Sequence, residues 1–134
     1  MIPKTNTILS TDLKLKTQPS KNYKLHIDYD VINGLCDGLE AMKQVVYKIL
    51  NTERYQCIIY SWNYGVELHD LYGEPFTYVC PELQRRITEA LVQDDRIDSV
   101  DSFEFDLAEK GTVKVTFTVH TIFGDFEAEK AVNF

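Results

Sequence analysis

The residue types that most often perform chemistry in proteins are scattered along this chain. The three histidines, His26, His69 and His120, are far apart, and two of them alternate with apolar residues as solvent-facing strand positions do. No G-x-S-x-G, H-E-x-x-H or glycine-rich phosphate motif occurs in the sequence. These patterns predict no catalytic residue, no cofactor and no metal site.

The three cysteines, Cys36, Cys57 and Cys80, form no C-x-x-C motif or Cys/His cluster, so a zinc site is not expected. Their odd number, and a sequence that starts without an apolar secretion signal, favour free thiols in a reducing cytoplasm. The net charge of -7 disfavours nucleic acid and anionic membranes as partners. No apolar run approaches the ~20 residues of a membrane helix.

Carboxylates are the one reactive group in surplus, since 21 acidic residues face 14 basic ones. Glu53, Glu67, Asp70 and Glu74 fall in one loop-rich stretch, which leaves open the carboxylate pair of a glycosidase. Solvated carboxylates on an acidic protein are the simpler interpretation.

The segment Asp94-Asp95-Arg96-Ile97 lies where a helix is expected to lead into a strand. A guanidinium held by a neighbouring carboxylate is a rigid, two-pronged donor that suits contact with a partner protein. A solvated helix end is the alternative, because a cation near a helix C-terminus is favourable in any case. The spacing alone favours this second interpretation.

These residues are expected to be positioned by one α+β domain. The 134 residues, of which 44% are hydrophobic, suit a single domain of roughly 100–150 residues. Residues 1–21 are polar and without a clear period, and we expect an extended N-terminal arm there. Residues 22–134 show separate helical and strand patterns joined by hairpin signals, which favours α+β over a parallel α/β sheet.

Two main helices are predicted. Apolar residues recur at helical spacing over residues 38–51, and Asp37 precedes them in a pattern similar to a capping box with Glu40. A second apolar stripe predicts a helix over residues 81–93, with Pro81 in its first turn. A short helix is expected near residues 66–72, before Gly73-Glu74-Pro75.

Strand patterns occupy both ends of the chain. Alternation over residues 23–29 and a turn at Asn33-Gly34 predict an N-terminal strand pair. Strict alternation over residues 112–120 predicts a strand with one buried face. With a strand near residues 100–105, and one over 126–134 after a turn at Gly124-Asp125, it forms a three-stranded antiparallel C-terminal unit.

Two further features have open interpretations. Three tyrosines, the only tryptophan and two isoleucines crowd into residues 55–65, and composition alone favours their burial. The last strand can offer an unpaired edge to a strand of another chain, or its charges at Glu127, Glu129 and Lys130 can protect that edge.

Four segments resemble the XkdS-type baseplate proteins of PBSX-like phage elements. They are residues 38–44, 47–55, 59–68 and 117–130, and the resemblance extends over about 22–134. These proteins are similar to the small, lysozyme-like wedge subunit of contractile-tail baseplates. The resemblance implies a structural protein without enzymatic activity. A lysozyme-like peptidoglycan glycosidase and an unrelated small binding module are the alternatives.

The broader family carries a Gly-Glu-Arg loop, an aromatic-Gly turn and a Glu-Pro-Arg motif. Thr52-Glu53-Arg54 stands at the position of the Gly-Glu-Arg loop but lacks its glycine, and Tyr64-Gly65 stands at the aromatic-Gly turn. Asp94-Asp95-Arg96 stands at the Glu-Pro-Arg motif, with Asp95 in place of the proline. The resemblance implies that this surface docks onto the large wedge subunit. The implied interface residues are Asp94, Arg96, Glu53, Arg54, Tyr64 and Gly65.

The resemblance also implies that the last strand joins the tail sheath protein and nucleates the sheath. The sheath-facing residues would be Phe126, Ala128, Lys130, Val132 and Phe134. A ring of about six copies per particle is implied, assembled in the cytoplasm of a bacterial host, with tail hub or tube-initiator proteins as further candidate partners. On this basis an interface becomes an equal alternative to burial for residues 55–64.

Overall fold

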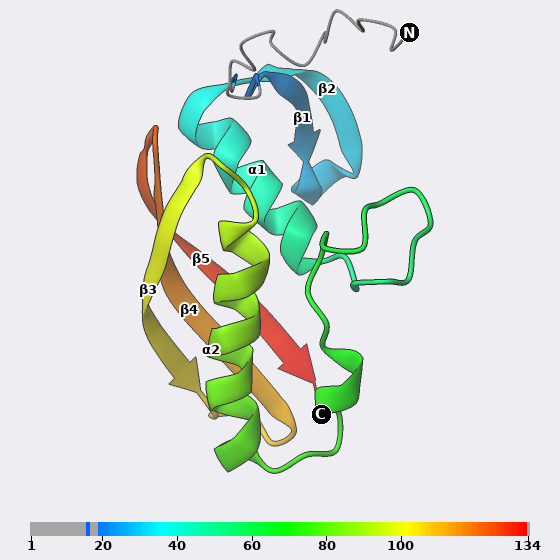
Figure 1. The fold of residues 1–134 in the computed structure, drawn as a ribbon, viewed down its shortest axis with the longest axis vertical. Coiled ribbons are helices and arrows are strands. Elements are labelled where there is room, and N and C mark those ends of the chain that lie inside the picture. Colours follow the sequence, from blue (N-terminus) through cyan, green and yellow to red (C-terminus); the bar gives the residue numbers. More distant parts are fainter. Residues whose placement is uncertain (1–15, 17–18, 134) are drawn as a thin grey trace, which may run out of the picture.

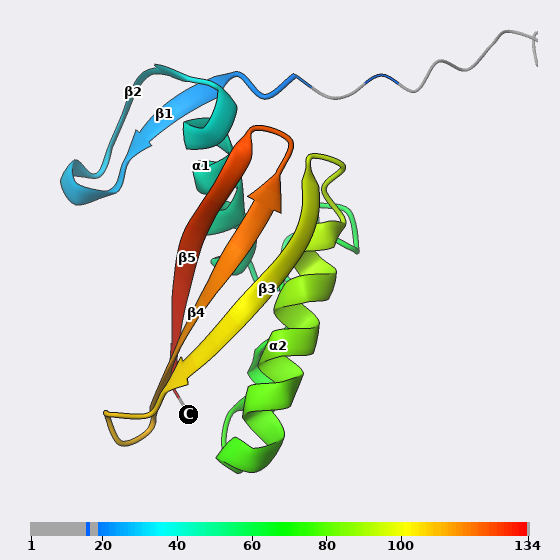
Figure 2. The same ribbon diagram turned by 90° about the vertical axis from the view of Figure 1, so that its left-hand side faces the viewer.

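The computed structural model describes residues 16 and 19–133, in which two helices cover one face of a three-stranded antiparallel sheet (Figure 1; Figure 2). The sheet contains β3 (Ile97–Asp106), β4 (Thr112–Thr121) and β5 (Gly124–Asn133), in that order. The predicted α+β fold is therefore confirmed. Most of the predicted N-terminal arm lies outside the described residues.

A separate two-stranded sheet precedes the helices. It pairs β1 (Asn22–His26) with β2 (Val31–Cys36) through the 3-10 turn η2 (Ile27–Tyr29). The predicted turn at Asn33-Gly34 is wrong, because the chain reverses at η2 and at Asp30, which has φ 52°. Gly34, at φ 79°, lies instead inside β2 opposite a shift in register. A left-handed glycine suits a β-bulge as well as a turn.

Helix α1 (Gly38–Leu50) closely matches the predicted helix. The Asp37 side chain caps it by accepting a hydrogen bond from the Gly38 amide at 2.7 Å. The predicted capping box with Glu40 is absent, because the Glu40 carboxylate pairs with Lys24 Nζ on β1 at 2.8 Å. This ion pair joins the helix to the N-terminal hairpin.

Helix α2 (Phe76–Val92) begins earlier than predicted. Pro75 is its N-cap, so the predicted start at Pro81 is wrong and Pro81 lies inside the helix. Pro81 lacks the amide that would reach the Thr77 carbonyl, and its ring crowds that same carbonyl. Val79 is fully buried one turn before Leu83, so burial of this extra turn offsets that loss.

The core lies between the helices and the sheet. The side chains of β4 that were predicted to face inward are all buried: Val113, Val115, Phe117 and Val119. The 3-10 turn η3 (His69–Leu71) buries Leu71 against the same core and replaces the predicted short helix. The hairpin between β4 and β5 turns at residues 122–123, two residues before the predicted turn, because Gly124 already pairs with Thr121.

Candidate functional site

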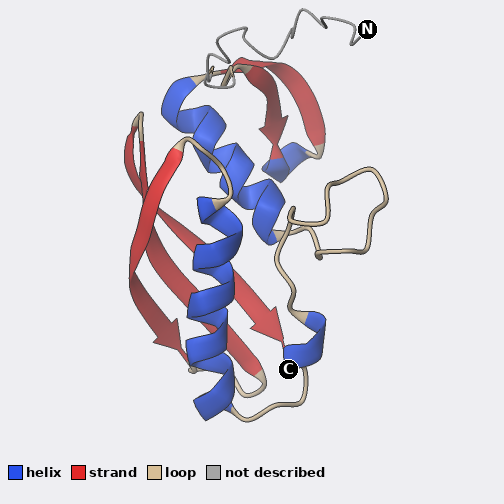
Figure 3. Cartoon of the chain, in the orientation of Figure 1, coloured by secondary structure: helices blue, strands red, loops and turns tan. Residues whose placement is uncertain are grey.

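A long loop between α1 and η3 contains four of the six predicted interface residues (Figure 3). It closes at its base, where the Val66 amide donates to the Thr52 carbonyl at 3.0 Å and the Arg54 amide donates to the Val66 carbonyl at 3.3 Å. Gly65 completes this closure with φ 91°. A Cβ at that position would lie 2.5 Å from the Thr52 carbonyl oxygen, so only glycine fits. We call residues 52–66 the closed loop.

Glu53 and Arg54 point into the molecule and fasten the closed loop. Glu53 Oε1 accepts hydrogen bonds from the amides of Leu68 and His69 at 2.9 and 3.1 Å. Arg54 donates to the Gly65 carbonyl at 3.2 Å and to Glu89 Oε1 on α2 at 2.9 Å. Both side chains are largely buried. Their contacts within the chain hold the loop against η3 and α2.

Asp94 and Arg96 form a two-pronged pair, although their spacing alone favoured a solvated helix end. Arg96 Nε and Nη2 donate to the two Asp94 carboxylate oxygens at 2.9 and 2.7 Å. Burial alone would raise the pKa of Asp94, but its hydrogen bonds from Arg96 outweigh burial and hold that pKa below its usual value. Arg96 also reaches Ser20 Oγ at 3.4 Å, a partner that sequence reasoning missed.

The fold brings the two halves of the predicted interface together. Asn63, in the closed loop, donates to Gln93 Oε1 at 3.3 Å, directly before Asp94. Burial raises the pKa of the Tyr64 phenol, and the negative charge of Asp94 adds to that effect. A hollow of about 220 Å³ adjoins this contact. It is lined by Gln93, Asp94, Asp95 and Arg96.

The tip of the closed loop projects away from the core. Its large apolar side chains are exposed, with relative exposures of 67% for Tyr55, 102% for Ile58, 86% for Ile59 and 81% for Trp62. The interpretation of these residues as core is therefore wrong. Composition alone could not distinguish burial from exposure, because it does not show that the loop extends away from the core and closes between residues 52 and 66.

The predicted sheath-facing side chains lie on the helix side of β5. Phe126 and Ala128 pack against the core and Val132 is buried within it. Lys130 donates to Asn51 Oδ1 at 2.9 Å, and burial lowers the pKa of its amine. Phe134 lies outside the described residues. A sheath contact at these positions stays a prediction.

The open edge of β5 is formed by the backbone groups of those residues that do not bond to β4. The two-residue hairpin loop closes on the pair Thr121–Gly124, and a loop of this kind closes on a hydrogen-bonded pair. Every second residue of β5 from Gly124 onward therefore bonds to β4, and those between direct their backbone groups outward. The outward residues are Asp125, Glu127, Glu129, Ala131 and Asn133.

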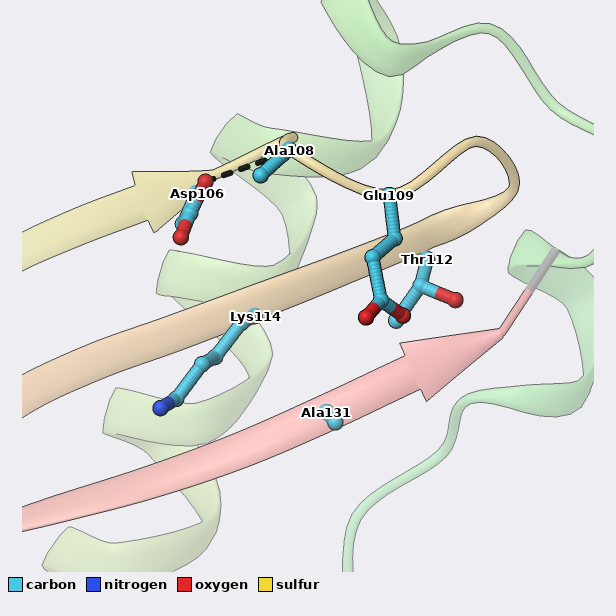
Figure 4. A pocket seen from close by; sticks show the side chains of 6 residues that line it. All are labelled: Asp106, Ala108, Glu109, Thr112, Lys114 and Ala131. Carbon is cyan, nitrogen blue, oxygen red and sulfur yellow. Dashed lines mark hydrogen bonds between the residues drawn. The ribbon is translucent and has the colours of Figure 1, made fainter.

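A hollow of about 190 Å³ on the open face of the sheet contains two carboxylates (Figure 4). Asp106 accepts a hydrogen bond from the Ala108 amide at 2.9 Å, and Glu109 projects from the turn between β3 and β4. Both carboxylates are exposed, whereas the acid of a glycosidase requires an apolar setting that raises its pKa. This hollow does not provide that setting.

A metal site requires several ligating side chains close together. The part of the chain that the structure describes contains no group of three or more His, Cys, Asp or Glu side chains suited to a metal ion. Cys36, Cys57 and Cys80 are all free thiols. Among the described helices, none combines the length and apolar character needed to cross a bilayer.

Comparison with known proteins identifies the family. The chain is 40% identical over 119 residues to the phage-like element PBSX protein XkdS of Bacillus subtilis strain 168, which covers 86% of this chain and 84% of that protein. A crystal structure from Geobacter sulfurreducens, provisionally assigned as a tail lysozyme, has a TM-score of 0.59 at 18% identity. That match covers 71% of this chain and 89% of the other, and it shows a shared fold.

The resemblance seen in the sequence is thus confirmed. The model of the contractile injection system sheath initiator family matches residues 12–124, which is most of the chain. The chain belongs to the contractile injection system sheath initiator family.

Proposed function

We propose that this protein is a baseplate wedge component of a contractile phage tail or a related particle, which docks on the large wedge subunit and nucleates the sheath. The family and the XkdS relative support the coarser statement, a structural role in a phage tail baseplate. The observation that carries the finer proposal is the free outer edge of β5 in a member of a sheath initiator family. The protein then acts by assembly, without bond chemistry.

The edge of β5 supports strand addition by the sheath. Within the described residues no strand pairs with its outer side, and the ladder to β4 runs over all ten residues from Gly124 to Asn133. Because β4 pairs with the whole length of β5, the outer edge of β5 is a stable template for a further strand. The proposed partner is an extended segment of the tail sheath protein.

The surface formed by the closed loop and the Asp94–Arg96 pair supports docking on the large wedge subunit. Its polar groups are fixed by hydrogen bonds within the chain, so little entropy is lost when a partner binds. The proposal extends to a ring of about six copies, assembled in the bacterial host cytoplasm, with the tail hub or tube initiator nearby.

Co-purification tests the sheath contact. The tagged chain is expressed with the large wedge subunit and the sheath protein of the same gene cluster, and the wild type should capture both. Ala131→Pro removes one outward amide of the β5 edge and leaves the ladder to β4 intact, because proline is tolerated where the amide faces solvent. We expect it to keep the wedge subunit and lose at least about tenfold in captured sheath protein.

Ala131→Val is the matched control and should capture both partners, since it keeps the amide. Equal capture of sheath protein by Ala131→Pro and wild type would contradict the edge contact. Failure of the wild type to capture any tail protein would contradict the structural role. Clearing of a bacterial cell-wall suspension by the purified chain would favour the glycosidase alternative instead.

A further inference from the structure

The tip of the closed loop is an apolar surface that the fold itself does not use. Ile58 and Ile59 are almost wholly exposed and Trp62 nearly so. Exposing such side chains to water is unfavourable, and contiguous apolar patches on a protein surface mark interaction sites. Aromatic residues of this kind also dominate the binding energy of protein interfaces.

The backbone holds this tip in one arrangement. Three successive turns are closed by hydrogen bonds from Gln56 to the Glu53 carbonyl, from Tyr60 to Cys57 and from Tyr64 to Ser61, at 3.4, 3.3 and 3.0 Å. Tyr55 adopts φ 70°, a left-handed conformation that is costly for an aromatic residue. A strained backbone conformation that the closed base keeps in place indicates that these side chains are held at the surface for binding.

The Tyr60 ring connects the tip to the core. It stacks on Tyr64 with ring centroids 4.5 Å apart, and Tyr64 packs against the hydrophobic core. A surface prepared in this way loses little conformational freedom on binding.

The charges around the loop indicate what covers the tip. No charged residue occurs from Tyr55 to Val66, whereas 26% of the whole chain is charged. Glu67 directly follows the loop, and the two arginines beside its base are already paired, Arg54 with Glu89 and Arg86 with Asp70. This setting opposes an anionic lipid surface, which requires cations beside the apolar residues. It suits an uncharged, concave protein surface.

The loop also lies on the side of the molecule proposed for the wedge subunit. Figure 1 shows it projecting beyond the C-terminal end of α1, while Glu53 and Gln56 near its base line a hollow together with the end of β5. Its Asn63 end contacts Gln93, beside the Asp94–Arg96 pair. The tip is therefore continuous with the proposed wedge surface.

We infer that the tip of the closed loop, residues 55–62, is the hydrophobic anchor that inserts into an apolar, uncharged pocket of the large wedge subunit. This inference rests on the proposed function and adds which residues bind. Glu53, Arg54 and Gly65 are then positioning residues that hold the loop closed. The interface is apolar at its centre, and the Asp94–Arg96 pair forms its polar rim.

A double variant at the tip tests the inference. Ile58→Ser combined with Ile59→Ser should leave the thermal midpoint unchanged, because neither side chain packs in the fold. Its dissociation constant for the purified large wedge subunit should rise at least about 100-fold. Leu107→Ser, which removes another exposed apolar side chain at a distant turn, is the matched control and should bind as the wild type does.

Cys57 offers a second readout within the tip itself. Its thiol is exposed, whereas Cys36 is buried and Cys80 half-buried. Saturating wedge subunit should slow the maleimide alkylation of Cys57 at least about tenfold, as expected for a buried interface centre. Unchanged alkylation in a stable complex would overturn the inference.

The remaining outcomes separate the inference from the proposal it rests on. Wild-type affinity in the double variant would overturn the anchor but keep the docking. No binding of the wild type to the wedge subunit would remove both. Self-association of the wild type that the double variant abolishes would assign the tip to a second copy. Binding to phosphatidylglycerol vesicles that the double variant loses would assign it to lipid, and either result overturns the inference.

Discussion

At the scale of single residues, Glu53 and Arg54 of the predicted interface stabilise the fold of the chain itself. Glu53 satisfies two amides at the start of the segment that leads into η3, and Arg54 joins the closed loop to α2. Their side chains are largely buried, so substituting them would change the loop as well as any contact. A loss of docking in such variants must therefore be compared with the tip variant, which leaves the base untouched.

Gly65 gives a clear prediction at this scale. Gly65→Ala should destabilise the protein strongly, because the new Cβ would meet the Thr52 carbonyl oxygen at 2.5 Å in a left-handed conformation. Gly73→Ala is the control, since its φ of 85° is similar but its surroundings are open. We expect about 1–2 kcal/mol for Gly73→Ala and at least about twice that for Gly65→Ala, measured by urea unfolding. Equal losses would contradict the close approach.

At the scale of elements, one histidine ties the three strands of the C-terminal sheet together. His120 on β4 donates from Nε2 to Asp101 on β3 at 2.9 Å and from Nδ1 to Asp125 on β5 at 3.0 Å. Hydrogen bonds to these two carboxylates raise the pKa of His120 above its ordinary value. Both ring nitrogens can donate only in the protonated imidazolium.

The stability of the sheet should therefore depend on pH. Because the folded pKa of His120 is raised, its stabilising contribution is complete below the unfolded value of about 6.5 and is lost as the pH rises through the folded pKa. The free energy of unfolding of the wild type should thus fall between pH 6 and pH 9. His120→Gln removes this titration, so the same loss in that variant would exclude the histidine as its source.

The β5 strand connects the scale of the element to that of the whole molecule. It is an edge of the sheet, yet its inward side chains complete the core against α1, where Val132 is buried. The strand proposed to receive the sheath therefore cannot be removed without exposing that core.

Deletion of residues 124–134 should abolish cooperative folding of the isolated chain, rather than only its contact with the sheath. The remaining chain would expose the buried face of β4 and one side of α1. Circular dichroism during thermal unfolding measures this, with the single substitution Ala131→Pro as the folded comparison. A sharp, wild-type-like transition in the deleted chain would show that β5 is dispensable for the fold.

At the scale of the whole molecule, the two proposed contacts are formed by different elements. The exposed tip projects from the loop after α1 (Figure 1), and the base of that loop lines one hollow together with the C-terminal end of β5. One small protein can thus contact a wedge subunit and a sheath strand at the same time. The two contacts can be tested separately, because Ala131 belongs to β5 whereas Ile58 and Ile59 belong to the loop after α1.

The sequence by itself determined the elements whose periodicity is set by burial. The spacing of apolar residues along the sequence shows which side chains are buried. That spacing predicts the limits of α1, the alternation of β4 and the α+β class. The family is likewise recognisable from short segments of sequence. The pairing of Asp94 with Arg96, two residues apart, was one of the two interpretations that the sequence left open.

Only the tertiary structure decided the rest. Pro81 lies in a helix interior, Asn33-Gly34 lies in a bulge and the tip of the closed loop faces solvent, and local preference predicted none of these. The loop that joins Glu53 to Val66, and the contact from Asn63 to Gln93, link residues whose proximity no local pattern records. Local propensities depend on residues within about one turn of the chain. Whether a side chain is buried or exposed depends instead on which distant segments pack beside it in the folded protein.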